Sequence, residues 1–253
     1  MKKFLDLKFL SIIFLLYSSL ITIQLYIYPG ELNTISRYDA SILAYLFGIL
    51  FAPITEEFIF RYWAYGKNIK LQFSLFIAFV IYMIIDLVQN FIFEILYISN
   101  NFEINIIFRN SLVIAFGLVF YYFIKKYNLN IPAFFYKLIY SRFTFYFIVI
   151  LFEAVHWYHT DFNYNYLPSY ILGFFASYLI TRHARDYGIY FSILFHIVNN
   201  TIGTLAEAID IRTESKNYVT NQLLFNYSII ALFCTSLYLI EFLRAKPLTL
   251  NQR

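Results

Sequence analysis

Residues 41–61 read SILAYLFGILFAPITEEFIFR, an apolar stretch that ends in two glutamates and an arginine. A helix needs about 20 mostly apolar residues to cross the hydrocarbon core of a bilayer. The run at 41–60 meets that length, and its apolar residues do not alternate with polar ones as a half-buried strand requires. We therefore expect a membrane-spanning helix that carries charged side chains near one end.

The rest of the chain repeats this pattern. Of its 253 residues 61% are hydrophobic, 23% aromatic and only 13% charged, with a mean hydropathy of +0.64, which is unlike soluble domains. Seven further apolar runs lie at 9–28, 71–97, 106–124, 143–158, 166–181, 187–209 and 222–243. The sequence therefore predicts an all-α, polytopic transmembrane helix bundle of about eight helices, formed by residues 1–253 as a single integral membrane domain.

The positions of lysine and arginine test this topology, because cytoplasmic loops collect positive charge. With both termini cytoplasmic, the cytoplasmic set is Lys2, Lys3, Lys8, Arg61, Lys67, Lys70, Lys125, Lys126, Lys137, Arg142, Arg182, Arg185, Arg244, Lys246 and Arg253. The other face holds only Arg37, Arg109, Arg212 and Lys216. We expect a multi-pass protein of the bacterial cytoplasmic membrane, with the lipid bilayer as a partner. The net charge of +4 then reflects topology, and no nucleic-acid partner is expected.

The first polar cluster inside the predicted helices is Glu56-Glu57-Phe58-Ile59-Phe60-Arg61. An ionisable side chain in hydrocarbon is costly unless it is paired or faces water, so it is a functional candidate. Glu57 and Arg61 stand at i and i+4 on one helix face and are expected to pair. Glu56 is then the candidate general base. The alternative is a helix end whose arginine reaches the interface.

Two further clusters place imidazole inside predicted spans. Glu153 and His156 lie in the run at 143–158, whereas His196 and Asn200 lie in the run at 187–209. His196 and Asn200 are four residues apart, so their side chains share one helix face and can donate to one oxygen atom. An intramembrane histidine can equally serve as a hydrogen-bonding link between helices.

The order Glu-Glu-x-x-x-Arg, Phe-x-x-x-His and His-x-x-x-Asn resembles the CPBP family of intramembrane proteases, which includes CAAX prenyl endopeptidases and bacteriocin-processing (Abi-type) proteins. The resemblance covers about residues 45–66 and 143–209. It implies that Glu56 and His156 activate the attacking water, that His196 and Asn200 stabilise the oxyanion, and that Glu57 and Arg61 organise the first motif. His156 follows Arg61 by 95 positions, which indicates an inserted pair of transmembrane helices at 71–125.

The resemblance implies an endopeptidase that cleaves a peptide or a lipid-modified protein. We predict direct attack by water with no cofactor. Glu56, His156 and His196 also offer the two-histidine, one-carboxylate set of a metalloprotease-like site, so a divalent metal such as zinc stays open. The rival from another class is a non-catalytic membrane protein, either an immunity-type interaction partner or a transporter, that uses the same polar residues to hold helices together.

Other polar residues are expected to be structural. Asp86, Asn90 and Glu94 form a stripe at i, i+4 and i+8, and we expect Glu94 to pair with Arg109. Asp86 is the one member of the stripe with a candidate role, in lining a substrate path. His159 and His183 are expected in interfaces or loops, without a catalytic role. Cys234 is the only cysteine and forms no intrachain disulfide.

Overall fold

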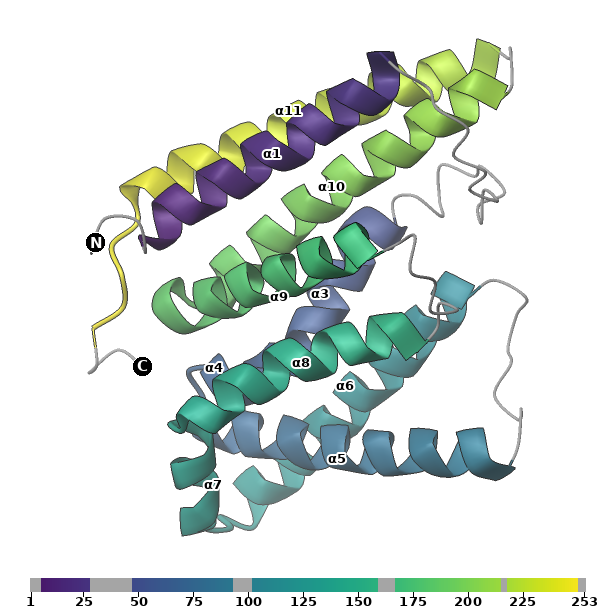
Figure 1. Ribbon diagram of the computed structural model, residues 1–253. Coiled ribbons are helices and arrows are strands. Elements are labelled where there is room, and N and C mark those ends of the chain that lie inside the picture. Colours follow the sequence, from purple (N-terminus) through teal and green to yellow (C-terminus); the bar gives the residue numbers. More distant parts are fainter. Residues whose placement is uncertain (1–5, 28–46, 93–101, 159–166, 215–217, 250–253) are drawn as a thin grey trace. The chain divides into compact units, whose positions relative to one another are not determined.

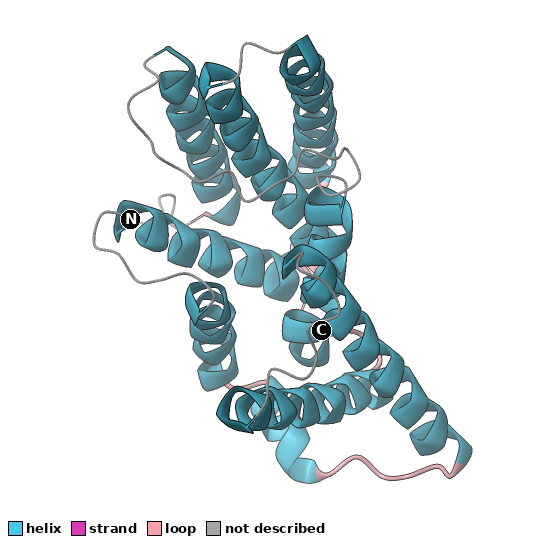
Figure 2. Ribbon diagram, turned by 90° about the vertical axis from the view of Figure 1, so that its right-hand side faces the viewer, coloured by secondary structure: helices cyan, strands magenta, loops and turns pink. Residues whose placement is uncertain are grey.

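The computed structural model describes residues 6–27, 47–92, 102–158, 167–214 and 218–249. Side chains are described at 6–20, 48–84, 110–154, 171–203 and 228–249. This part of the chain is helical and contains no strand (Figure 2). The predicted all-α class is confirmed for the described residues, whereas the prediction of a single domain stays a prediction.

Most predicted apolar runs correspond to one long helix each. These helices are α1 (Leu7–Ile27), α5 (Ile69–Ile92), α6 (Phe102–Lys126), α8 (Arg142–Tyr158), α9 (Leu167–Tyr187), α10 (Ile189–Glu214) and α11 (Tyr218–Arg244). A short helix in a predicted basic loop, α7 (Ala133–Ile139), was not predicted. It follows Pro132, and it buries Phe135 and Ile139, which stand four residues apart on one face.

The run at 41–60 is where the structure departs most from a regular helix. Its described part consists of the π-helix η2 (Phe47–Phe51), α3 (Ala52–Glu56) and the π-helix η3 (Glu57–Tyr62), followed by α4 (Trp63–Tyr65). Pro53 has no N–H to donate to the carbonyl of Ile49, which agrees with the widened turn that precedes it. π-Helical turns inside helices are often found at functional sites.

Length and composition of the helices bear on a membrane crossing. No single helix, within the residues that the structure describes, is both long and apolar enough to cross a bilayer. One bent pair, α7 with Arg142–Ala154 of α8, reaches the required length and composition together, with an angle of 68° at the break.

The chain divides into two compact units, which we describe separately. The terminal unit comprises Met1–Pro53 and Ile193–Lys246, and the central unit comprises Ile54–Ser192 and Pro247–Arg253. Figure 1 shows the helices of both.

In the terminal unit, buried Phe195 of α10 packs between Phe14 of α1 and Tyr238 of α11, with ring centroids 5.9 and 5.5 Å away. α1 and α11 lie side by side (Figure 1), because Lys8 Nζ donates hydrogen bonds to carbonyls near the end of α11. The acceptors are the carbonyl oxygens of Leu243, at 3.0 Å, and Ala245, at 2.8 Å. A cation at the C-terminal end of a helix also interacts favourably with the helix dipole.

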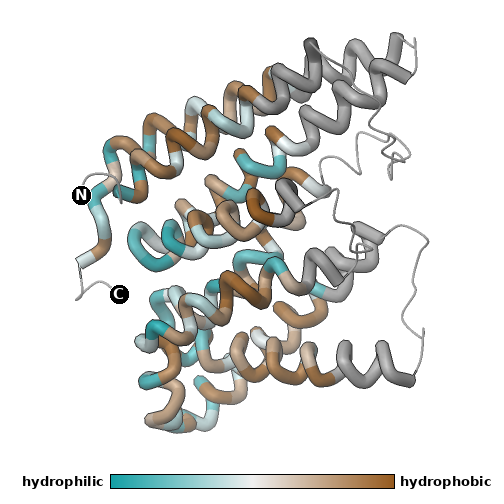
Figure 3. Tube along the Cα trace, viewed as in Figure 1, coloured by the Kyte–Doolittle hydropathy of each residue, from teal (hydrophilic) through white to brown (hydrophobic). Residues whose placement is uncertain are grey.

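In the central unit, aromatic side chains join η3 to the long helices. Phe60 packs edge-on against Phe79 of α5 and Phe152 of α8, with ring centroids 5.8 and 5.3 Å away. Trp63 of α4 packs against the same Phe79 at 6.2 Å. Apolar residues cover much of α5 and α8 (Figure 3). Burial of these rings is the main favourable term that fixes η3 in place.

A glycine sets the corner between α9 and α10. Gly188 has φ +98°, a left-handed conformation that residues with a Cβ rarely adopt. Its N–H donates to the carbonyls of His183 and Ala184, at 3.0 and 3.1 Å, which closes α9. The C-terminal segment also reaches this corner, because the N–H of Leu248 donates to the carbonyl of Asp186 at 2.8 Å.

Candidate functional site

The predicted ion pair between Glu57 and Arg61 is confirmed. Arg61 Nη1 lies 2.5 Å from Glu57 Oε1, and both side chains are completely buried. The two residues stand four apart in η3, with the acid on the N-terminal side as expected. The alternative interpretation, an arginine that extends to an interface, does not describe the structure, because Arg61 has no exposed surface.

Arg61 also connects η3 to two other helices of the central unit. Its Nε donates to Thr181 Oγ1 at 3.1 Å, and its Nη2 donates to Ser177 Oγ at 3.4 Å, both on α9. The guanidinium carbon lies 4.2 Å from the centre of the Phe152 ring of α8. These contacts give a buried cation several hydrogen bonds and an aromatic face, as desolvated charge requires.

The carboxylate of Glu57 accepts a second hydrogen bond, from Ser192 Oγ at the start of α10. Glu57 therefore accepts hydrogen bonds from side chains of η3 and α10 and links these two helices. Glu56, the predicted general base, is the adjacent residue and is 8% exposed. The structure brings Glu56, Glu57 and Arg61 into one buried segment of the central unit, where the ion pair restrains the backbone that carries Glu56.

His196 and Asn200 lie in the terminal unit, both on α10. His196 is 3% exposed, so its imidazole is buried. The Asn200 amide donates from Nδ2 to the carbonyl oxygen of Gly48, in η2, at 3.2 Å. This bond satisfies a carbonyl of the π-helical turn, and it uses one of the two N–H donors that the amide offers.

For several predicted site residues, the structure does not describe the side chain. His156 lies in α8 and Asp86 and Asn90 lie in α5, but only their backbone is described. Glu94 and His159 lie outside the described residues, and the side chain of Arg109 does too, so the predicted pair of Glu94 with Arg109 stays a prediction. The described side chains contain no group of three metal ligands, and the zinc set that includes His156 stays open with it.

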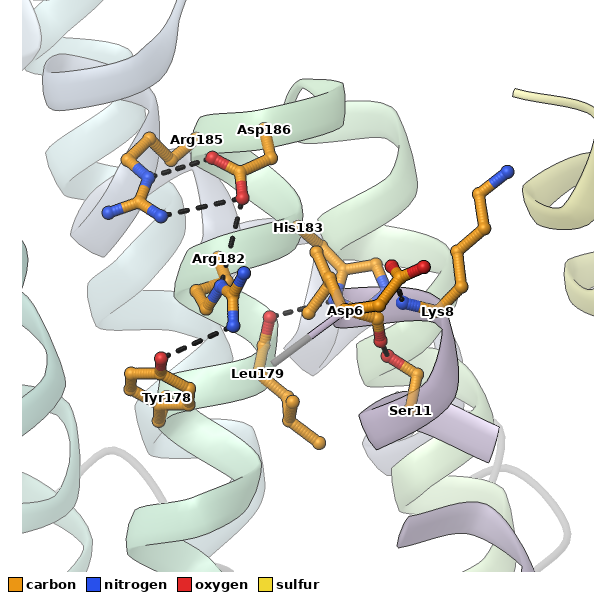
Figure 4. A network of polar contacts seen from close by, with 10 residues as sticks. Asp6, Lys8, Ser11, Tyr178, Leu179, Arg182, His183, Arg185 and Asp186 are labelled. Atoms are coloured by element: carbon orange, nitrogen blue, oxygen red, sulfur yellow. Dashed lines mark hydrogen bonds and ion pairs between the residues drawn. The ribbon is translucent and has the colours of Figure 1, made fainter. Parts of the chain in front are cut away.

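His183 corrects part of one prediction. It lies in the helix α9 rather than in a loop, and it is completely buried, whereas its expected position near a membrane interface stays a prediction. Its Nδ1 donates to the carbonyl of Leu179 at 2.7 Å (Figure 4). Burial lowers the pKa of His183 to about 4, although this hydrogen bond acts in the opposite direction. The ring is therefore neutral at pH 7.

A second charged cluster lies on the same helix, next to His183 in the sequence but on the more exposed face. Asp186 lies 2.8 Å from Arg185 Nε and 3.7 Å from Arg182 Nε (Figure 4). Arg185 also stacks on Phe145, 4.7 Å from the ring centre, and Arg182 donates to the Tyr178 hydroxyl at 3.3 Å. Unlike the pair in η3, these side chains are partly exposed.

Sequence reasoning missed the residues that support the ion pair. Ser177 and Thr181 stand four residues apart in an otherwise apolar run, so their spacing is a signal that a helix face carries hydroxyl groups. Ser192 has no second hydroxyl residue four positions away, so the sequence gives no such signal for it. Glu153 is buried, and its carboxylate lies against Gly173 of α9, where a Cβ would come within 2.6 Å of Oε2.

Comparison with known protein families, with curated proteins and with solved structures finds no match to the chain.

Proposed function

We propose that the chain is a multi-pass membrane protein that hydrolyses a peptide bond. The membrane placement is supported by large apolar side chains on the outer faces of single helices. On α8 these are Phe143, Tyr146, Phe147 and Ile150, and on α11 Leu232 and Phe233 are 68% and 67% exposed. Extended apolar surface is unfavourable in water but suits contact with lipid chains. The bilayer of a bacterial cytoplasmic membrane is the proposed environment, with both termini on the cytoplasmic side.

The proposed chemistry is attack by a water molecule that Glu56 and His156 activate. His196 and Asn200 are proposed to donate to the oxygen that becomes negative in the tetrahedral intermediate. Glu57 and Arg61 act as positioning residues. The observation that carries the proposal is the completely buried Glu57–Arg61 pair directly beside Glu56, since such a network restrains the backbone of a neighbouring carboxylate.

The proposed substrate is a peptide or a lipid-modified protein, because an active site inside a bilayer receives chains that are already associated with lipid. The reaction as proposed needs no cofactor. A zinc ion held by Glu56, His156 and His196 is the alternative way to activate the same water.

The test is a cleavage assay on the full chain in lipid nanodiscs, with libraries of prenylated and unmodified peptides analysed by mass spectrometry. We expect Glu56→Gln to reduce cleavage at least about 100-fold, as removal of a general base usually does. Glu153→Gln is the matched control, because it changes another buried glutamate of the central unit. Added chelator separates the two mechanisms, since only the zinc mechanism loses activity.

A non-catalytic role is the second candidate, and two observations favour it. Asn200 donates a hydrogen bond to the Gly48 carbonyl, and Arg61 donates to hydroxyl groups of α9. Both side chains therefore link helices. In that case, wild type and Glu56→Gln would both leave every peptide in the libraries intact while remaining folded. That result would contradict the protease proposal.

A further inference from the structure

The central unit contains a cavity of about 420 Å³ that the proposed reaction does not use. It lies among α4, α7, the start of α8, the α9–α10 corner at Gly188, and Leu248 of the C-terminal segment. Its volume is within the range of about 300–1,000 Å³ that is usual for small-molecule pockets.

The charges around the cavity have one sign. Lys67, Arg142 and Arg185 line it, and none of the described lining residues is Asp or Glu. Arg185 is partly neutralised by Asp186, at 2.8 Å. Lys67 and Arg142 form no ion pair with any described residue and are exposed, so they keep their full charge. The cavity therefore favours an anion.

A buried amide gives an independent indication of a ligand. Gln72 of α5 lines the cavity and is only 5% exposed, and its side chain takes part in none of the hydrogen bonds described. Its amide atoms keep some accessible surface, and because Gln72 lines the cavity, a ligand inside it can reach them. An oxygen-rich ligand would offer this amide hydrogen-bond partners.

Hydroxyl groups and apolar side chains complete the lining. Tyr65 and Tyr140 contribute phenol groups. Burial raises the pKa of Tyr65 well above its usual value, although the charges of Arg185 and Arg61 act in the opposite direction, so the hydroxyl keeps its proton and can donate. Ile139 and Phe145 supply apolar surface on another side of the cavity.

We propose that this cavity binds the phosphate of an anionic phospholipid head group. Lys67, Arg142 and Arg185 would hold the phosphate, Gln72 would bond to its oxygens or to the head-group hydroxyls, and Ile139 and Phe145 would contact the glycerol and first acyl carbons. The site goes beyond the proposed hydrolysis. The choice of a lipid phosphate over free inorganic phosphate rests on the membrane placement proposed above. In that placement, Lys67, Arg142 and Arg185 lie at the cytoplasmic boundary.

The test measures binding of short-chain phosphatidylglycerol to the full chain in neutral detergent, by native mass spectrometry and by the shift of the thermal unfolding midpoint. Short-chain phosphatidylcholine, glycerol 3-phosphate and inorganic phosphate are the comparison ligands. The pocket variant Lys67→Ala/Arg142→Ala removes two exposed cations of the lining. Lys125→Ala/Lys126→Ala removes two exposed cations outside it and is the matched control. Gln72→Leu changes the buried amide without changing charge.

We expect phosphatidylglycerol to bind at least about tenfold more weakly to the pocket variant, within twofold of wild type to the control, and several-fold more weakly to Gln72→Leu. Equal weakening by pocket variant and control would overturn the proposal, because it would show general attraction to a basic protein. Unchanged binding by the pocket variant would overturn it too. Binding of inorganic phosphate as tight as that of phosphatidylglycerol would reject the lipid source.

A photoactivatable phosphatidylglycerol gives a readout that does not depend on how well a variant folds. In the wild-type chain we expect adducts on peptides that contain Tyr140 or Tyr190, which both line the cavity. Adducts confined to other peptides would overturn the site. Neither measurement depends on the proteolytic activity proposed for the chain itself, so failure of the protease proposal and failure of this one are distinguishable.

Discussion

The central unit contains two clusters of opposite charges that differ in burial. In η3 the Glu57–Arg61 pair is completely buried and bonded to hydroxyls, whereas on α9 Asp186 and its two arginines keep between 14% and 36% of their side-chain surface exposed. Exposed pairs contribute about 0–1 kcal/mol, because water and salt screen them. Removing one partner of a buried pair costs far more, because an uncompensated charge is left behind. The burial of an ion pair therefore affects stability more than the number of ion pairs does.

The largest expected effect is from Arg61→Met. It leaves Glu57 buried without its cation, and we expect a loss of about 3–5 kcal/mol in the free energy of unfolding. The measurement is denaturant unfolding of the detergent-solubilised chain. Arg182→Met, in the partly exposed cluster, is the control and should cost about 1 kcal/mol or less. Equal losses would remove the distinction between the clusters.

Acidification should lower the free energy of unfolding through the buried imidazole of His183. The folded pKa of His183 is about 4, below the 6.5 of an unfolded chain, so between these values the unfolded state binds the extra proton. Stability from His183 is complete above pH 6.5 and is lost as the pH falls to about 4, by about 3 kcal/mol in all. Arg182, Asp186 and Glu57 also influence this titration. The measurement is unfolding at several pH values for wild type and His183→Gln; the same slope in both would contradict the prediction.

Ser192→Ala sharpens the comparison by removing only one neutral donor from the buried pair. Glu57 then loses one hydrogen bond to a charged oxygen, and we expect a cost of about 2 kcal/mol. Ser74→Ala is the matched control, because Ser74 is also fully buried but bonds only to the carbonyl of Lys70 in its own helix. Thermal unfolding midpoints of the two variants should differ, and a larger shift for Ser74→Ala would count against the network.

The smallest expected effect is from Asp186→Asn. Its ion pairs with Arg182 and Arg185 are partly solvated, so we expect a loss below about 1 kcal/mol that shrinks further in 1 M salt. Unfolding at low and high salt measures it. A loss that salt does not change would indicate that Asp186 acts through hydrogen bonds rather than through its charge.

The helices could be predicted from the sequence because long apolar runs carry a strong local signal. The same is true of the Glu57–Arg61 pair, since a spacing of four within one helix fixes which side chains meet. Both predictions depend only on residues that are close together in the sequence. The π-helical turns around Pro53 were not predicted, because they depend on how the segment packs as well as on the proline.

Hydrogen bonds between residues far apart in the chain could not be predicted from the sequence. Ser192 meets Glu57 across 135 residues, and Gly48 meets Asn200 across 152, so no spacing rule connects them. The loop predicted around His183 was wrong for a related reason: Arg182, Arg185 and Asp186 give this segment the composition of a solvated loop. In the structure one face of α9 is buried while these charges occupy the other.

The hydrogen bonds of Lys8 have a consequence for the order in which the protein is made. Their acceptors lie 235 and 237 residues further along the chain, so α1 leaves the ribosome long before its partners exist. Residues 54–192, by contrast, form most of the central unit and are all synthesised before α11. Because domains tend to fold as units during synthesis, the central unit can assemble first, and the terminal unit closes only once translation passes Ala245.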